Sequence, residues 1–316
     1  MVTRHKVAYI FPGQGAQYVG MGKGLYDKFP LTRQVYDAAN DIAGFDLKSL
    51  CFEGPAERLS TTAFSQPAIL VTSIAALQCV QAYVPGLDVK AALGLSLGEY
   101  TALVAAESLS FEDGVRLVRS RGQFMEEASR DNPGKMASVI GIERAVAEDI
   151  CKKAGCEIAN LNCPGQIVIS GTADSVEKAI FMASEKGARK SIILDVSGAF
   201  HSSLMAGAKD KLAAVLDGVV VRRPIFPFIG NVNASYESTP LKIKDNLLKQ
   251  LTGRTYWEDS IRLLMKDGVE TFIEIGPGKV LKGLLRRIDS NLTVHSAGTA
   301  EDMRILAESG VAGVLN

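Results

Sequence analysis

The chain has 316 residues, of which 47% are hydrophobic and 22% charged, a composition typical of a globular protein with one or two domains. The formal net charge is zero at pH 7, which argues against nucleic-acid binding because such proteins carry a basic excess. Five cysteines without C-x-x-C spacing predict neither a disulfide framework nor a zinc site. We therefore expect a reducing compartment and no metal or cofactor.

The N-terminal residues run directly into a predicted strand and show no signal-peptide pattern. The longest apolar stretch, residues 68–84, is interrupted by polar side chains and is short for a membrane span. We therefore expect this stretch to form a helix in the core of a soluble, cytoplasmic protein that does not bind a membrane. Nothing in the sequence requires more than a monomer.

In chain order, strand and helix patterns alternate over most of the sequence, which predicts an α/β fold with a mostly parallel, covered sheet. The Gly-rich loop at 12–17 has Tyr18 where a dinucleotide fingerprint needs glycine, so a nucleotide site is disfavoured. Outside 131–198, we expect strands at 7–11, 91–93, 225–232 and 271–275, and helices at 31–43, 68–84, 99–108, 111–128, 204–216, 243–252, 257–266 and 279–288.

Near residue 131 the pattern changes to strand, helix, strand, strand, helix, strand, the order of a ferredoxin-like unit. Its expected strands are 135–141, 157–161, 166–171 and 191–196, and its helices are 143–153 and 175–186. The sequence thus predicts a large α/β-hydrolase-like domain from residues 1–130 and 199–316. A small inserted domain spans 131–198.

The sequence G-x-S-x-G at 94–98, with Ser96 at its centre, separates a short apolar strand from an Ala-rich helix. In so tight a strand-to-helix turn the flanking residues must be glycine, because a side chain would collide with the neighbouring strand or helix. The turn projects the serine hydroxyl from the sheet and brings the amides of the helix N-terminus beside it, which favours developing negative charge. An ordinary Gly-rich turn is the alternative.

Arg121 falls on the apolar face of the helix predicted at 111–128, together with Leu117, Val118 and Met125. A buried arginine needs an anionic partner, because an unpaired buried charge is costly. That partner is either an internal Asp or Glu or the carboxylate of a ligand.

Ser96 needs a base, because a serine hydroxyl is a weak nucleophile near neutral pH. Of the three histidines, His5 precedes the first strand and His295 lies in the C-terminal segment. His201 lies where the chain leaves the predicted insert, a natural cleft position, and is the best candidate. Asp195 or a backbone carbonyl could orient it. From spacing alone the site is one for acyl transfer, and either a hydrolase or a transferase fits.

Together these motifs resemble malonyl-CoA:acyl-carrier-protein transacylases, the discrete acyltransferases of bacterial fatty-acid synthesis, which are similar to the acyltransferase domains of polyketide synthases. The resemblance extends nearly from end to end. It rests on F-P-G-Q-G at 11–15, Gln66-Pro67-Ala68, G-x-S-L-G-E at 94–99, Arg121-Gly122, the turn at 162–166, F-H-S at 200–202, Q-L-T at 250–252 with Trp257, and E-I-G-P-G at 274–278.

The resemblance implies that malonyl groups pass from malonyl-CoA through Ser96 to the thiol of acyl carrier protein, in ping-pong order, to supply fatty-acid synthesis. His201 is then the base, oriented by the main-chain carbonyl of Gln250, and Arg121 holds the free carboxylate. The oxyanion hole is implied at the amides of Gln14 and Leu97. The implied substrate-binding residues are Arg121, Met125, Phe200, Gln66, Asn162 and Gln166.

Three further features refine this expectation. Phe200 resembles the A-F-H pattern of malonyl-selective polyketide enzymes, and its ring would crowd an α-methyl branch, so malonyl is expected over methylmalonyl. Many members have His where this chain has Leu95, and Pro-Val where it has residues 253–256. The family's carrier is acidic, and basic residues that could meet it are Lys279, Lys282, Arg286, Arg287, Arg189 and Lys190.

Three alternatives stay open. A trans-acting polyketide acyltransferase would use the same residues. A serine thioesterase or hydrolase on the same turn would lose its acyl group to water. A carrier-binding module with a decayed site would not react at all.

Overall fold

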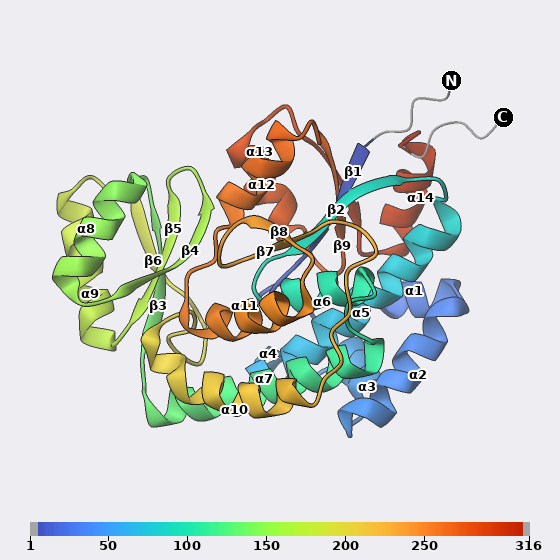
Figure 1. Ribbon diagram of the computed structural model, residues 1–316, viewed down its shortest axis with the longest axis horizontal. Coiled ribbons are helices and arrows are strands. Elements are labelled where there is room, and N and C mark those ends of the chain that lie inside the picture. Colours follow the sequence, from blue (N-terminus) through green and yellow to red (C-terminus); the bar gives the residue numbers. More distant parts are fainter. Residues whose placement is uncertain (1–5, 312–316) are drawn as a thin grey trace.

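The computed structural model describes residues 6–311, which form two β-sheets and the helices that cover them (Figure 1). The larger sheet has six strands in the order β10-β9-β1-β2-β7-β8. Four of its pairings are parallel and only β7 with β8 is antiparallel. Its strands are β1 (Lys6–Phe11), β2 (Asp88–Gly94), β7 (Phe228–Gly230), β8 (Ser235–Glu237), β9 (Thr271–Ile275) and β10 (Thr293–Ala297).

Both faces of the larger sheet are buried, as a parallel sheet requires. Successive residues of a strand point to opposite faces, and β1 shows the result. Val7, Tyr9 and Phe11 join the core on one face, and Ala8 and Ile10 join the core on the other. The prediction of a mostly parallel, covered sheet is confirmed.

Helices from the N-terminal half form most of the layer on the first face. They are α1 (Lys23–Lys28), α2 (Leu31–Ala43), α3 (Leu47–Glu53), α4 (Ala56–Ser60), α5 (Thr62–Tyr83), α6 (Leu97–Ala105) and α7 (Phe111–Asp131). The remaining helices of this part are η1 (Ser203–Met205), α10 (Ala206–Asp217), α11 (Pro240–Thr252), α12 (Trp257–Lys266), α13 (Val280–Ile288) and α14 (Ala300–Glu308). Helices α12 and α13 cover the second face.

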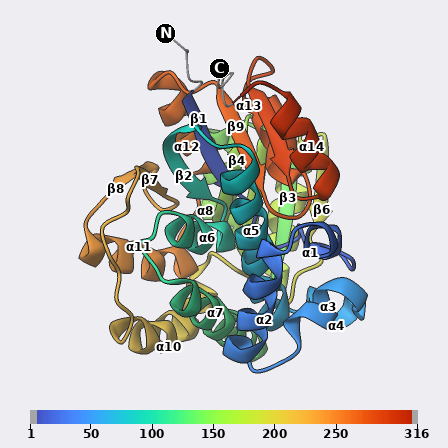
Figure 2. The ribbon, with the colours of Figure 1, turned by 90° about the vertical axis from the view of Figure 1, so that its right-hand side faces the viewer.

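The long apolar helix α5 packs against α2, α6 and α7 in the middle of this layer (Figure 2). By length and composition it could cross a membrane, yet 89% of its most apolar window is buried inside the protein. The prediction of a buried core helix is confirmed. The predicted start at residue 68 is wrong, because the helix begins at Thr62 and continues through Pro67.

The smaller sheet has four strands in the order β4-β5-β3-β6, and every pairing in it is antiparallel. Its strands are β3 (Lys135–Ile140), β4 (Glu157–Cys163), β5 (Gln166–Gly171) and β6 (Lys190–Ile193). Helices α8 (Arg144–Ala154) and α9 (Ala173–Glu185) share a separate hydrophobic core with it and cover its outer face (Figure 1). Strand β4 contacts α12 and α13, which places this sheet beside the larger one.

Most predicted elements are present, but several boundaries are wrong. The strand expected over 225–232 is only β7, because Pro227 has no N–H for a sheet bond. The strand expected over 191–196 ends at Ile193. Strands β8 and β10 and helices α1, α3, α4 and α14 were not predicted. Strand β8 has three residues, too few for a detectable alternation.

Candidate active site

Ser96 occupies a sharp turn between β2 and α6, with φ 53° and ψ −106°. This left-handed backbone is rare and strained for a residue with a side chain. A Cβ on Gly94 would lie 2.0 Å from the carbonyl of Gly98, and a Cβ on Gly98 would lie 2.1 Å from the carbonyl oxygen of Phe11 in β1. Both glycines are therefore sterically required, as the sequence predicted.

His201 is the base candidate that the structure places beside the serine. Its Nε2 lies 2.8 Å from Ser96 Oγ, and its Nδ1 lies 2.7 Å from the main-chain oxygen of Gln250. Because that carbonyl can only accept, Nδ1 carries the proton and Nε2 is free to accept from the hydroxyl. Burial and the charge of Arg121 lower the pKa of His201 to about 4, so the imidazole is neutral at pH 7.

The other candidates for the base and its orienting group lie elsewhere. Asp195 is exposed, and a backbone carbonyl, not a carboxylate, orients His201. His295 lies on β10 in register with Ile273. His5 lies outside the described residues.

Arg121 projects from α7 to the same point and is only 1% exposed. Its guanidinium donates to Gln66 Oε1 at 2.8 Å, to Gln250 Oε1 at 2.9 Å and to Ser96 Oγ at 3.2 Å. It forms no ion pair with any Asp or Glu among residues 6–311, and its Nε has no hydrogen-bond partner there. The internal ion pair weighed from the sequence is therefore not found, and an anionic ligand remains the candidate partner.

Sequence reasoning missed Asn231, which follows β7 and is buried. Its Oδ1 accepts from the Ser96 N–H at 2.7 Å, and its Nδ2 donates to the Gly94 carbonyl at 2.7 Å. A polar residue at the carboxyl end of a predicted parallel strand was the available signal, because such ends gather at the site edge of a sheet.

The sequence also gave no role to Glu99, although it belongs to the G-x-S-L-G-E motif. This carboxylate is 1% exposed and accepts from the Asn231 N–H at 3.2 Å and from Gln250 Nε2. Burial raises the pKa of Glu99 to about 8, while these two hydrogen bonds and the charge of Arg121 act in the opposite direction.

A cavity of about 200 Å³ opens above Ser96, between the two sheets. Nine of the eleven predicted site residues line it: Ser96, His201, Gln14, Leu97, Arg121, Met125, Phe200, Asn162 and Gln166. The other two, Gln66 and Gln250, lie behind Arg121 and bind its guanidinium. Unpredicted lining residues come from the smaller sheet and the segment after it: Met136, Asn160, Val168, Leu194 and Val196. Leu95, a departure from the family pattern, also lines the cavity.

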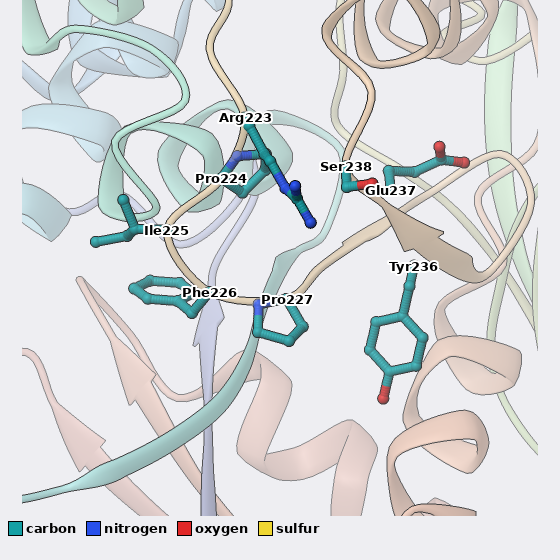
Figure 3. A pocket seen from close by; sticks show the side chains of 8 residues that line it. All are labelled: Arg223, Pro224, Ile225, Phe226, Pro227, Tyr236, Glu237 and Ser238. Carbon is teal, nitrogen blue, oxygen red and sulfur yellow. The ribbon is translucent and has the colours of Figure 1, made fainter.

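A larger opening, of about 550 Å³, lies apart from Ser96 beside β7 and β8. Ile225 and Phe226 lie on one side of it and Tyr236 on the other (Figure 3). None of its eight lining residues is a predicted site residue. The chemistry therefore belongs to the smaller cavity.

The geometry around Ser96 fits transfer of an acyl group that carries a carboxylate. A hydroxyl, a neutral imidazole and a guanidinium meet within hydrogen-bond distance. The imidazole can take the hydroxyl proton, and the guanidinium can form charge-assisted hydrogen bonds to the carboxylate.

Comparison with known proteins defines the class: the acyl transferase domain family matches residues 8–306, and the chain belongs to it. Within that class it belongs to the malonyl CoA-acyl carrier protein transacylase family. It is 44% identical to the Bacillus subtilis (strain 168) protein of that name, over 96% of this chain and 97% of the relative.

Solved structures show the same relationship. The acyl-carrier-protein-S-malonyltransferase from Bartonella henselae matches with a TM-score of 0.93 and 42% identity, covering 98% of this chain and 100% of that one. A structure described as a type II PKS acyl-carrier protein in complex with its malonyl-transacylase also matches, with a TM-score of 0.93 and 36% identity. The match covers 96% of this chain and 99% of the matched chain.

Proposed function

We propose that this protein transfers the malonyl group of malonyl-CoA to the thiol of an acyl carrier protein through a malonyl ester on Ser96. The observation that carries the proposal is the distance of 3.2 Å between Arg121 and Ser96 Oγ. This buried cation has no carboxylate partner in the described chain and lies beside a nucleophile that has its base. A malonyl group supplies the missing carboxylate, and its thioester carbon is two bonds from that carboxylate carbon.

In the first half-reaction, Ser96 Oγ attacks the thioester carbonyl and His201 Nε2 takes the hydroxyl proton. The tetrahedral intermediate collapses with loss of CoA sulfur, which receives that proton from His201. In the second half-reaction His201 takes the proton of the carrier thiol, whose sulfur attacks the malonyl ester. Collapse then returns the proton to Ser96. His201 is neutral again after each half-reaction, and after both of them Ser96 has regained its hydroxyl proton.

The remaining site residues stabilise charge and position groups. Leu97 is the first residue of α6, and N–H groups in the first turn of a helix lack intrahelical partners. We assign its amide and that of Gln14 to the oxyanion hole, worth a few kcal/mol of transition-state stabilisation. The main-chain carbonyl of Gln250 orients His201, and Gln66 holds Arg121. Met125, Phe200, Asn162 and Gln166 contact the acyl group or the arm that carries it.

The second substrate is an acidic carrier protein that docks on α13. Val280 and Leu284 of this helix line the cavity, and Lys282 and Arg286 lie on one of its faces, three and four residues being one helical turn. Arg287 donates a hydrogen bond to Gln166, one of the cavity residues. The related complex of a carrier protein with its malonyl-transacylase supports a partner of this kind. Lys279, Arg189 and Lys190 extend the basic surface.

The finer organisation of the fold is part of the proposal. We assign residues 131–198 to a ferredoxin-like insert in an α/β-hydrolase-like domain formed by 1–130 and 199–316. Numbered within the insert, the sheet order β4-β5-β3-β6 becomes 2-3-1-4, which supports this assignment. We also propose a cytoplasmic monomer that needs no cofactor. The five cysteines are unpaired and buried, which is consistent with a reducing compartment.

The test is mass spectrometry of the intact protein mixed with malonyl-CoA, followed by proteolysis and then by addition of reduced holo-carrier protein. The proposal predicts a malonyl adduct on the Ser96 peptide that is stable to water for minutes and is discharged by the carrier. Loss to water as fast as to carrier would identify a hydrolase. No adduct would leave a binding module with an inactive site.

A further inference from the structure

The side-chain amide of Gln250 is held in one orientation by three neighbours. Its Oε1 accepts from Arg121 at 2.9 Å, and its Nε2 donates to the Ser96 carbonyl at 2.8 Å and to Glu99. The first neighbour can only donate and the other two accept, so a flipped amide would face unfavourable contacts on both sides. Gln250 therefore links the carboxylate of Glu99 to the guanidinium of Arg121.

Glu99 is suited to enforce this orientation. It lies on α6, three residues after the nucleophile, and faces two N–H donors, the amide of Gln250 and the main chain of Asn231. The charged groups that act on its pKa are Arg121, which lowers it, and Glu237, which raises it. In its ionised form the carboxyl group offers an acceptor to each of the two donors, which no neutral side chain of this size can do.

We propose that Glu99 is a positioning residue for acyl selectivity: through Gln250 it orients the Arg121 guanidinium toward the carboxylate of the acyl group. Glu99 does not touch the reacting atoms, and its effect reaches only substrates that Arg121 binds. The inference rests on the proposed function, because it assumes that Arg121 holds the malonyl carboxylate.

The substitution Glu99→Gln tests this with almost no change in volume. The new side chain has one acceptor and one NH₂ group, but it still faces two donors. With its oxygen kept on the main-chain N–H of Asn231, its NH₂ group faces Gln250, so that amide turns and Arg121 loses an acceptor.

The experiment compares single-turnover acylation of Ser96 by malonyl-CoA and by acetyl-CoA, which has no carboxylate. For E99Q we expect kcat/KM for malonyl-CoA to fall roughly 10- to 100-fold, the effect of one hydrogen bond to a charged group. Acylation by acetyl-CoA should change by less than about threefold. In a Gln250→Met background, which keeps the carbonyl that orients His201, E99Q should add no further selective loss.

Glu274→Gln is the matched control. Glu274 is also fully buried and also accepts two N–H groups, those of Leu281 and Lys282 at 2.9 and 2.8 Å, but its side chain has no hydrogen bond to Glu99, Gln250 or Arg121. E274Q should therefore leave the ratio of malonyl to acetyl rates unchanged. If E99Q does not fold, Glu99→Asp, which keeps the carboxyl group but withdraws it from Gln250, should give a smaller selective loss.

An equal fall for both acyl groups in E99Q would overturn the inference, because it would assign Glu99 a purely structural role. Failure of the proposed function looks different, because the wild-type protein itself would then form no malonyl adduct.

Discussion

Asn231 holds the main chain at the nucleophile and two residues before it: its side-chain oxygen accepts from Ser96 N–H and its side-chain nitrogen donates to Gly94 O, each at 2.7 Å. The backbone of Ser96 is left-handed, and such a conformation costs on the order of 1–3 kcal/mol. These two hydrogen bonds, one buried and one partly buried, each contribute on the order of 1 kcal/mol and offset much of that strain. The sharp turn is thus maintained by a residue 135 positions away in the sequence.

Asn231→Ala should therefore slow acylation of Ser96 by every acyl-CoA to the same extent. Two buried main-chain groups lose their partners, at a cost of about 1–3 kcal/mol each, and the hydroxyl is no longer fixed. We expect a roughly 10- to 100-fold fall in the acylation rate, measured by rapid-quench mass spectrometry. Asn246→Ala, which removes one buried bond to Glu237, is the control and should retain the wild-type rate. If Ser96 of the N231A variant is acylated at the wild-type rate, this role of Asn231 is contradicted.

Much of the fold and of the site could be predicted because the determining residues are close in sequence. Only glycine fits sterically at positions 94 and 98 of the strand-to-helix turn, so the G-x-S-x-G motif itself specifies the turn. The apolar face of α7 predicted the burial of Arg121. His201 followed from there being only three histidines and from its place at the predicted domain junction.

What could not be predicted depends on contacts between distant segments. The roles of Asn231 and Glu99 depend on partners from other elements, Ser96 and Gly94 for Asn231 and Gln250 for Glu99. The lining residues Met136 and Val168 alternate along strands of the smaller sheet and are indistinguishable in sequence from its core residues. Short β8 and the start of α5 were missed because tertiary packing, and not local preference, decides them.

The rate of Ser96 acylation should depend on a group with a pKa of about 4. Burial and the charge of Arg121 both disfavour the imidazolium form of His201, which lowers its pKa from 6.5 to about 4. Only the neutral form accepts a proton, so kcat/KM for acetyl-CoA, which depends neither on Glu99 nor on a substrate carboxylate, should fall as the pH drops through about 4 and should be level from about 5.5 to 8. Arg121→Met removes one of the two causes and should raise the apparent pKa. A wild-type profile with its midpoint near 6.5 would contradict the assignment.

Phe200→Ala should widen the range of acyl groups accepted. Phe200 is buried and lines the cavity immediately before His201, and we expect its ring to occupy the space that an α-methyl branch would need. We expect kcat/KM for methylmalonyl-CoA to rise relative to malonyl-CoA by roughly tenfold, the size of effect that one methyl group has in a pocket. Met205→Ala, a buried residue that does not line the cavity, is the control. An unchanged ratio in F200A would show that another residue excludes the branch.

Reversing two charges on α13 should weaken the use of carrier protein alone. Lys282→Glu with Arg286→Glu should raise KM for the carrier roughly tenfold at low ionic strength, with the difference shrinking as salt is added. The rate of Ser96 acylation by malonyl-CoA should not change, and steady-state assays of each half-reaction separate the two. The control is Lys23→Glu with Lys28→Glu, the same change of charge on exposed α1. Equal losses in both half-reactions would exclude a docking role.

Arg121→Ala distinguishes a transferase from a hydrolase that uses the same Ser96 nucleophile. The wild-type guanidinium offers donors to a malonyl carboxylate, and loss of two charge-assisted hydrogen bonds predicts a roughly 10²- to 10⁴-fold fall in kcat/KM for malonyl-CoA. In R121A, binding of acetyl-CoA no longer leaves a buried charge unpaired, so the rate with acetyl-CoA should rise relative to the rate with malonyl-CoA. Arg119→Ala is the control: it lies on the same helix, with its guanidinium 4.7 Å from the Phe45 ring, and should keep malonyl preference. A hydrolase would show nearly the same acyl preference in wild type and R121A, with the ester lost to water in both.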